Sequence, residues 1–280
     1  MTDLPFSEKY GYAPDPTPKP DDHFPGWVRY AIANEIKILN DNSPSSSLPY
    51  IDLYSFFRPY IWKVLDTMPP GNPMGGPWAH YIPATLLKCP WWQYYDILEQ
   101  LTLHIEKRWG GGYTNDFSAK VNTILAREGI QWKLENGKVV RVLNPQIEKQ
   151  VKEVSILLAS PKFKGPDEQF AKALESLNKR PEPDKENCVK DAVGAIEAVA
   201  NIIADTRRVQ LNTLLNREPF RSNVPPTIRE AIEKIYAYRG ASPGVAHGQV
   251  GPSVVSIAEA TWVLATSAAT MLYLASLMLN

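Results

Sequence analysis

The sequence predicts an α-helical protein in two parts, with one small β-hairpin. Apolar residues recur every three or four positions in most long segments, which is the spacing of a helix that buries one face. Two short β-type runs around Asn136-Gly137 are the one clear strand signal. With 280 residues, the chain has room for two ordinary domains. We expect an N-terminal domain over 1–160 and a C-terminal helical bundle over 161–280.

Composition excludes several classes of protein. Thirty basic residues balance thirty acidic ones, so we expect no general attraction for nucleic acid, although a local basic patch is compatible with this balance. Cys89 and Cys188 lie far apart and match no metal or redox spacing, which predicts a reduced, cytoplasmic protein. No basic stretch followed by an apolar one opens the chain, so we expect no secretory signal.

The N-terminal part alternates proline-rich stretches with helices. Prolines at 14–25 predict an extended opening, and a second proline-rich stretch at 69–90 predicts irregular structure. Apolar stripes predict helices over 28–39 and 94–105. Glycines then end the second helix, and a new short helix is expected over 117–126.

The hairpin is predicted by its turn. Asn136 and Gly137 both accept positive φ, which a two-residue hairpin turn requires, and the β-type runs 131–135 and 138–142 flank them. An isolated hairpin is only marginally stable. We therefore expect this hairpin to pack on the helical body through Trp132.

The C-terminal part has the most regular helical spacing. We expect helices over 147–158, 170–177, 189–203, 228–238 and 254–279. The last of these has no formal charge from 262 onward and reaches the length of a membrane span. Polar residues interrupt it and no Lys or Arg flanks it, so we expect a buried core helix and no membrane.

Arg239 and His247 are the candidate catalytic residues, in a glycine-rich stretch between two predicted helices. Imidazole transfers protons near neutral pH, and guanidinium binds phosphate oxygens and stabilises charge on them. The pair suits cleavage of RNA by its own 2′-OH, without a metal. The alternative is structural: Arg239 complements the dipole at a helix C-terminus and His247 caps the next helix.

Other polar residues carry weaker signals. Tyr238 and Ser242 could donate hydrogen bonds to a substrate, and Arg208 could bind phosphate in a locally basic half of the chain. The remaining histidines stand at 23, 80 and 104, and none has the i, i+4 spacing of a helical metal site. We expect no metal and no cofactor.

Several stretches resemble the AbiJ-type abortive-infection proteins of bacterial antiphage defence. Residues 6–12 are similar to the start of their N-terminal domain, and 129–145 to its end. Residues 187–200, 236–248 and 259–270 resemble their C-terminal domain, a helical bundle of the HEPN superfamily. In that superfamily an Arg and a His before the last long helix form a ribonuclease site shared between two copies of the chain.

The resemblance implies a function and partners. Arg239 and His247 match the family's Arg and His, separated here by the seven residues 240–246, more than is usual in the superfamily. It implies an AbiJ-like sensor or regulatory domain followed by a HEPN-like, metal-independent RNA endonuclease of abortive infection. The implied partners are RNA and a second copy, joined through the C-terminal bundle. The alternative is a non-catalytic HEPN-like module that binds RNA, a nucleotide or a protein.

Overall fold

The protein is predominantly α-helical, as predicted. A computed structural model describes residues 22–41, 53, 56–61, 63, 77–241 and 255–277. These contain one sheet, a two-stranded antiparallel hairpin. The chain divides into two compact units, Met1–Val142 and Leu143–Asn280. Each has a hydrophobic core of its own.

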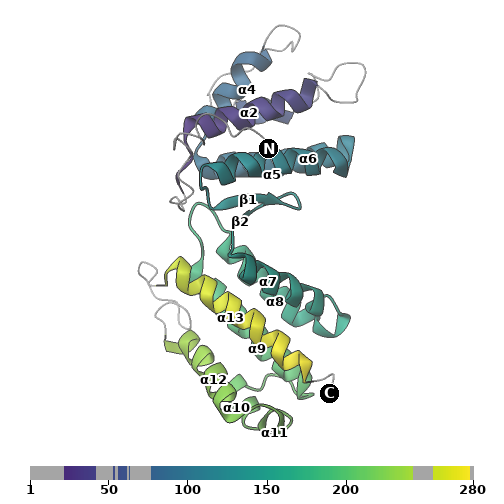
Figure 1. Ribbon diagram of the computed structural model, residues 1–280, viewed down its shortest axis with the longest axis vertical. Helices are drawn as coiled ribbons and strands as arrows, with labels where there is room; N and C mark the ends of the chain where they lie inside the picture. Colours follow the sequence, from purple (N-terminus) through teal and green to yellow (C-terminus); the bar gives the residue numbers. More distant parts are fainter. Residues whose placement is uncertain are drawn as a thin grey trace, which may run out of the picture. The chain divides into compact units, whose positions relative to one another are not determined.

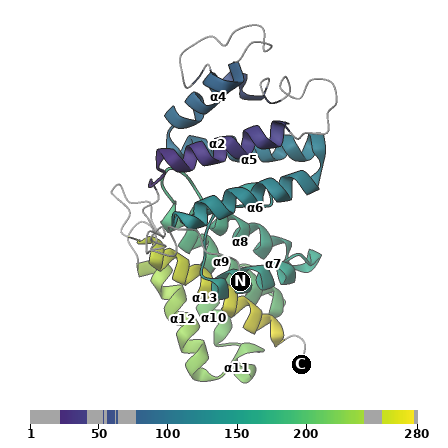
Figure 2. The ribbon, with the colours of Figure 1, turned by 45° about the horizontal axis from the view of Figure 1, so that its top comes forward.

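In the first unit, helices pack on one another and on the hairpin (Figure 1). Helix α6 contacts α2, α5 and β1, and α2 also contacts α4. Figure 2 shows α2, α5 and α6 running alongside one another. The elements are α2 Gly26–Asp41, α4 Pro77–Lys88, α5 Trp91–Trp109, α6 Gly111–Arg127, β1 Trp132–Glu135 and β2 Lys138–Arg141.

The predicted apolar stripes form the core of this unit. Val28, Ile32 and Ile36 of α2 are fully buried, and so are the stripe residues of α5. One local prediction was wrong: helix α4 occupies part of the stretch predicted to be irregular, since a proline at the first helical position needs no N–H partner. The helix expected over 117–126 is present but longer. It is α6, which begins directly after Gly110, and the φ of 91° at this one glycine separates it from α5.

Arg29 of α2 holds the end of α4. Its guanidinium donates to the carbonyls of Leu86 at 3.2 Å and Leu87 at 3.3 Å, and also to that of Cys89. These are carbonyls that a helix C-terminus leaves without intrahelical partners. The same guanidinium lies 4.9 Å from the ring centroid of Phe24. A charged side chain thereby fixes the position of a helix that contains an internal proline.

The predicted hairpin is confirmed. Glu135 pairs with Lys138, and the two-residue turn between them has φ of 50° at Asn136 and 75° at Gly137. The Trp132 ring is buried, with its centroid 5.8 Å from that of Tyr95 on α5. The hairpin therefore docks on the helices through Trp132, as expected.

Side chains from two helices occupy the outer edges of the hairpin. Asn122 of α6 donates to the carbonyl of Leu134 at 2.8 Å and accepts from its N–H at 2.6 Å. Glu99 of α5 accepts from the N–H of Val139 at 2.9 Å. A sheet edge otherwise exposes unpaired backbone groups. These amide and carboxylate contacts allow a two-stranded sheet to persist without further strands.

The second unit is a helical bundle arranged around α9. Helix α9 packs against α8, α13, α10 and α12, and α13 also packs against α7 (Figure 1). The elements are α7 Pro145–Leu158, a 3-10 turn Pro161–Phe163, α8 Lys164–Leu177, α9 Lys185–Ile203, α10 Leu211–Leu215, α11 Phe220–Asn223, α12 Pro226–Ala241 and α13 Ile257–Ser276.

The compact units divide between Val142 and Leu143, because α7 packs against α13. The expected domains 1–160 and 161–280 stay a prediction. The short helices α10 and α11 were not predicted, since four or five residues are too few to show a helical period.

Helix α13 has the length and composition of a membrane span, the one such helix among the described residues. Val263, Leu264, Ala268, Met271 and Leu274 lie in the core of the second unit. The helix contacts α9, α7 and α8, as expected for a core helix.

We predict that Asn122→Ala lowers the free energy of unfolding by about 1–3 kcal/mol, because it leaves a backbone donor and acceptor of β1 unpaired. Urea denaturation monitored by tryptophan fluorescence measures the change. Thr123→Ala is the control, since Thr123 is exposed and bonds only within its own helix. Equal effects of the two substitutions would contradict the role given to Asn122.

Candidate functional site

Arg239 lies in the last turn of α12 and is half-buried. Its Nη2 donates to the Tyr236 hydroxyl at 3.0 Å, and its guanidinium carbon lies 4.5 Å from the centroid of the same ring. Among the described residues, no carboxylate forms an ion pair with Arg239. The guanidinium is thus oriented by an aromatic ring rather than neutralised by an acid, so it has charge and donors for an anion.

Glu197 of α9 fixes the start of α10 and lies near Tyr236. It accepts from the N–H of Leu211 at 3.2 Å. Burial raises the pKa of Tyr236, and the nearby Glu197 carboxylate raises it further, while Arg239 opposes both effects. Tyr236 therefore stays protonated at neutral pH, and its hydroxyl oxygen accepts from Arg239.

Asn201 holds the loop that carries Arg208. The Asn201 side chain accepts from the N–H of Val209 at 3.0 Å and from the Thr206 hydroxyl at 3.0 Å, and it donates to the Val209 carbonyl at 2.8 Å. Arg208 is exposed, with a φ of 56°. The loop continues into Leu211, which Glu197 binds.

Helix α13 begins with a capped N-terminus. Ser256 caps this helix: its hydroxyl accepts from the N–H of Glu259 at 3.1 Å, and Glu259 accepts from the N–H of Ser256 at 2.7 Å. These hydrogen bonds with Ser256 lower the pKa of Glu259, and the nearby Tyr238 hydroxyl lowers it further. Tyr238 of α12 thus lies near the start of α13. Ser256 occupies the N-cap position of α13, the position that the alternative interpretation gave to His247.

Two other predicted site residues, His247 and Ser242, lie outside the described residues. The last turn of α12 is where a helix dipole stabilises a cation, so this structural role of Arg239 stands beside the catalytic one.

The remaining histidines make structural contacts where their side chains are described. Nε2 of His23 lies 2.8 Å from Oε1 of Glu128, and the His104 ring lies 5.2 Å from that of Phe56. The side chain of His80 lies outside the described part. No group of three or more His, Cys, Asp or Glu residues able to hold a metal occurs among the residues that the structure describes.

Sequence reasoning missed Glu197 and Tyr236. Glu197 is the one charged residue in the run 192–203, which is apolar apart from it and Asn201, and a charge on such a helix signals a partnered side chain. Tyr236 stands three positions before Arg239 on the same helix, where side chains are neighbours. Both signals were present in the sequence, but each acquires meaning only when its partner is known.

The comparison with protein families decides the identity of the first part of the chain. The family model described as AbiJ N-terminal domain 4 matches residues 4–155, more than half of the chain. The chain belongs to this family. The AbiJ resemblance of the N-terminal part is confirmed, and it associates the protein with abortive-infection defence. The match extends into α7, which packs in the second unit. No curated protein matches this AbiJ-type chain, and no solved structure does.

We predict that Glu197→Ala destabilises the AbiJ-type protein by about 1–3 kcal/mol, because the backbone N–H of Leu211, at the start of α10, loses its acceptor. Urea denaturation measures the change. Glu197→Gln is the matched control, since its amide oxygen can still accept this bond, and it should retain most of the stability. If both variants were as stable as the wild type, Glu197 would not be an anchor of the site.

Proposed function

We propose that the second unit is a HEPN-like bundle that cleaves RNA without a metal, as an effector of abortive infection. The observation that carries this proposal is the state of Arg239: its guanidinium is held by Tyr236 and paired with no described carboxylate. A cation positioned in this way suits a phosphate. The stretch that follows α12 carries His247, which supplies a group for proton transfer.

The proposed reaction uses the RNA's own 2′-OH as the nucleophile. His247 takes the proton of this hydroxyl while its oxygen forms a bond to the adjacent phosphorus. The bond from phosphorus to the 5′-oxygen breaks, and the leaving oxygen takes a proton. Products are a 2′,3′-cyclic phosphate and a 5′-hydroxyl. Arg239 binds the non-bridging oxygens and stabilises the charge that builds on them.

We predict that the purified protein cleaves single-stranded RNA in the presence of a chelator. Arg239→Ala should lower the rate by about 10²–10³, the usual effect of removing a donor that stabilises transition-state charge. His247→Ala should lower it by about 10²–10⁴, the range of general acid–base catalysis. Gel electrophoresis of end-labelled RNA, with detection of the cyclic phosphate end, measures both.

A matched variant controls for folding. Arg217→Ala removes an exposed arginine from the same unit and should leave cleavage unchanged. Equal cleavage by the wild type, Arg239→Ala and His247→Ala would mean a contaminating ribonuclease and would overturn the assignment of this site. Binding of RNA without any cleavage would favour the non-catalytic HEPN-like module.

We also propose that the protein forms a homodimer through the second unit. The outer face of α13 carries Trp262, whose exposed fraction is 56%, together with the small residues Ala258, Ala265 and Ala269. Large aromatic residues on an apolar surface are typical anchors of protein interfaces. A shared cleft would bring two copies of Arg239 to one RNA strand.

We predict that the wild type elutes as a dimer in gel filtration with light scattering, and that Trp262→Arg elutes as a monomer because it places a charge on the apolar face. Trp27→Arg, at a tryptophan that is 47% exposed on α2, is the control and should leave the dimer intact. A wild type that stays monomeric at roughly tens of micromolar, a concentration at which weak dimers form, would remove the shared cleft.

A further inference from the structure

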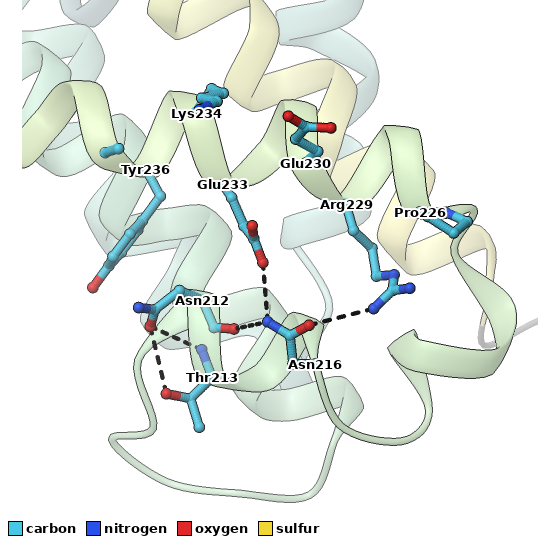
Figure 3. A pocket seen from close by; sticks show the side chains of 10 residues that line it. Asn212, Thr213, Asn216, Pro226, Arg229, Glu230, Glu233, Lys234 and Tyr236 are labelled. Carbon is cyan, nitrogen blue, oxygen red and sulfur yellow. Dashed lines mark hydrogen bonds between the residues drawn. The ribbon is translucent and has the colours of Figure 1, made fainter.

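An open groove of about 870 Å³ lies between α10 and α12, within the second unit (Figure 3). Its volume is in the range of about 300–1,000 Å³ that is usual for ligand sites. Helix α10 contributes Asn212 and Asn216, and α12 contributes Arg229, Glu233 and Tyr236. The lining is unusual for a small-molecule pocket because amide, hydroxyl and charged side chains outnumber the apolar ones.

Hydrogen bonds fix the carboxylate of Glu233 in this groove. Asn216 donates from Nδ2 to Oε1 of Glu233 at 3.0 Å and to the carbonyl of Asn212 at 2.9 Å. Its Oδ1 accepts from Arg229 at 3.5 Å (Figure 3). Both amide hydrogens of Asn216 are thereby used, and Asn216 holds the Glu233 carboxylate in place. The bonds of the described residues use one oxygen of Glu233, so its other oxygen has capacity for a ligand donor.

Asn212 presents a donor to the same groove. Its Oδ1 accepts from the N–H of Thr213 at 2.8 Å, and its side chain is exposed. No described residue accepts from its Nδ2. The groove therefore offers one amide donor and one carboxylate acceptor, the combination that recognises the hydrogen-bonding edge of a nucleobase.

Tyr236 connects this groove to Arg239. Its side chain lines the groove, and its hydroxyl and ring hold the guanidinium. Charge differs between the two places. Arg229 and Lys234 line the groove together with Glu230 and Glu233, so its lining charges balance, whereas Arg239 is paired with no described carboxylate and attracts phosphate. A nucleotide bound here would therefore place its base in the groove and its phosphate at Arg239.

The carboxylate discriminates among bases. Cytosine, adenine and guanine carry an exocyclic amino group that can donate to Glu233. Uracil has no amino group, and the carbonyls that flank its single N–H would face the carboxylate. We propose that the groove binds an amino-bearing base of single-stranded RNA, in the nucleotide adjoining the phosphate held by Arg239. This inference rests on the proposed function and names the sequence preference of the same site.

The test measures binding and cleavage separately. Fluorescence anisotropy with labelled oligocytidylate, oligoadenylate and oligouridylate, in chelator and at one fixed salt concentration, gives the binding preference. We expect the wild type to bind the cytidine and adenosine oligomers about tenfold more tightly than the uridine oligomer, since one good base contact discriminates by about 1–3 kcal/mol. Glu233→Gln, which keeps an acceptor for Asn216, should reduce this ratio several-fold.

Two further variants separate base recognition from general effects. Glu175→Gln makes the same change of charge at an exposed position of α8 and should preserve the ratio. Asn212→Ala, also at an exposed position, should lower the ratio without unfolding the protein. Arg239→Ala should weaken all three oligomers alike, because it removes a phosphate contact.

The outcomes distinguish this inference from the proposed function. A preference lost in Glu233→Gln supports the groove, even if the wild type cleaves no RNA and the nuclease proposal fails. Cleavage with an unchanged preference in Glu233→Gln overturns the groove and leaves the nuclease standing. Uridine bound as tightly as cytidine and adenosine, or no RNA binding at all, also overturns the groove.

Discussion

The carboxylate of Glu197 is the constraint on which the second unit's site depends. It is the one charge within residues 192–203 of α9, and a charge in such a stretch is stable only if a donor satisfies it. The N–H of Leu211 is such a donor and fixes the start of α10. The same carboxylate raises the pKa of Tyr236 on α12, so this phenol stays protonated and accepts from the guanidinium of Arg239.

The same principle explains the hairpin of the first unit. A two-stranded sheet has two unpaired edges, and in this chain Asn122 and Glu99 bond to them from neighbouring helices. Arg29 serves the carbonyls at the end of α4 in the same manner. In both units, polar side chains on helices form hydrogen bonds with backbone N–H and C=O groups that have no partner within their own element. These bonds hold the hairpin and the helix ends in fixed positions.

The family match and the site concern different parts of the protein. The AbiJ N-terminal domain 4 match covers residues 4–155, whereas Arg239, Tyr236 and Glu197 belong to the second unit. The link with abortive-infection defence therefore comes from the first part of the chain. The proposed RNA cleavage depends on side chains in the second. Arg239 is bound by the Tyr236 ring and is paired with no carboxylate of the described residues. This state and the polar groove beside Tyr236 both favour a nucleic acid over an apolar ligand.

The sequence by itself determined the long helices, the hairpin and the docking of Trp132, because apolar periodicity and an Asn-Gly turn are local signals. It also singled out Arg239. It did not reveal α10 and α11, the helix within 77–88, or the packing of α7 with the second unit. Tertiary structure alone joined Glu197, Leu211 and Tyr236, because residues so far apart in the chain become partners only through the packing of α9, α10 and α12.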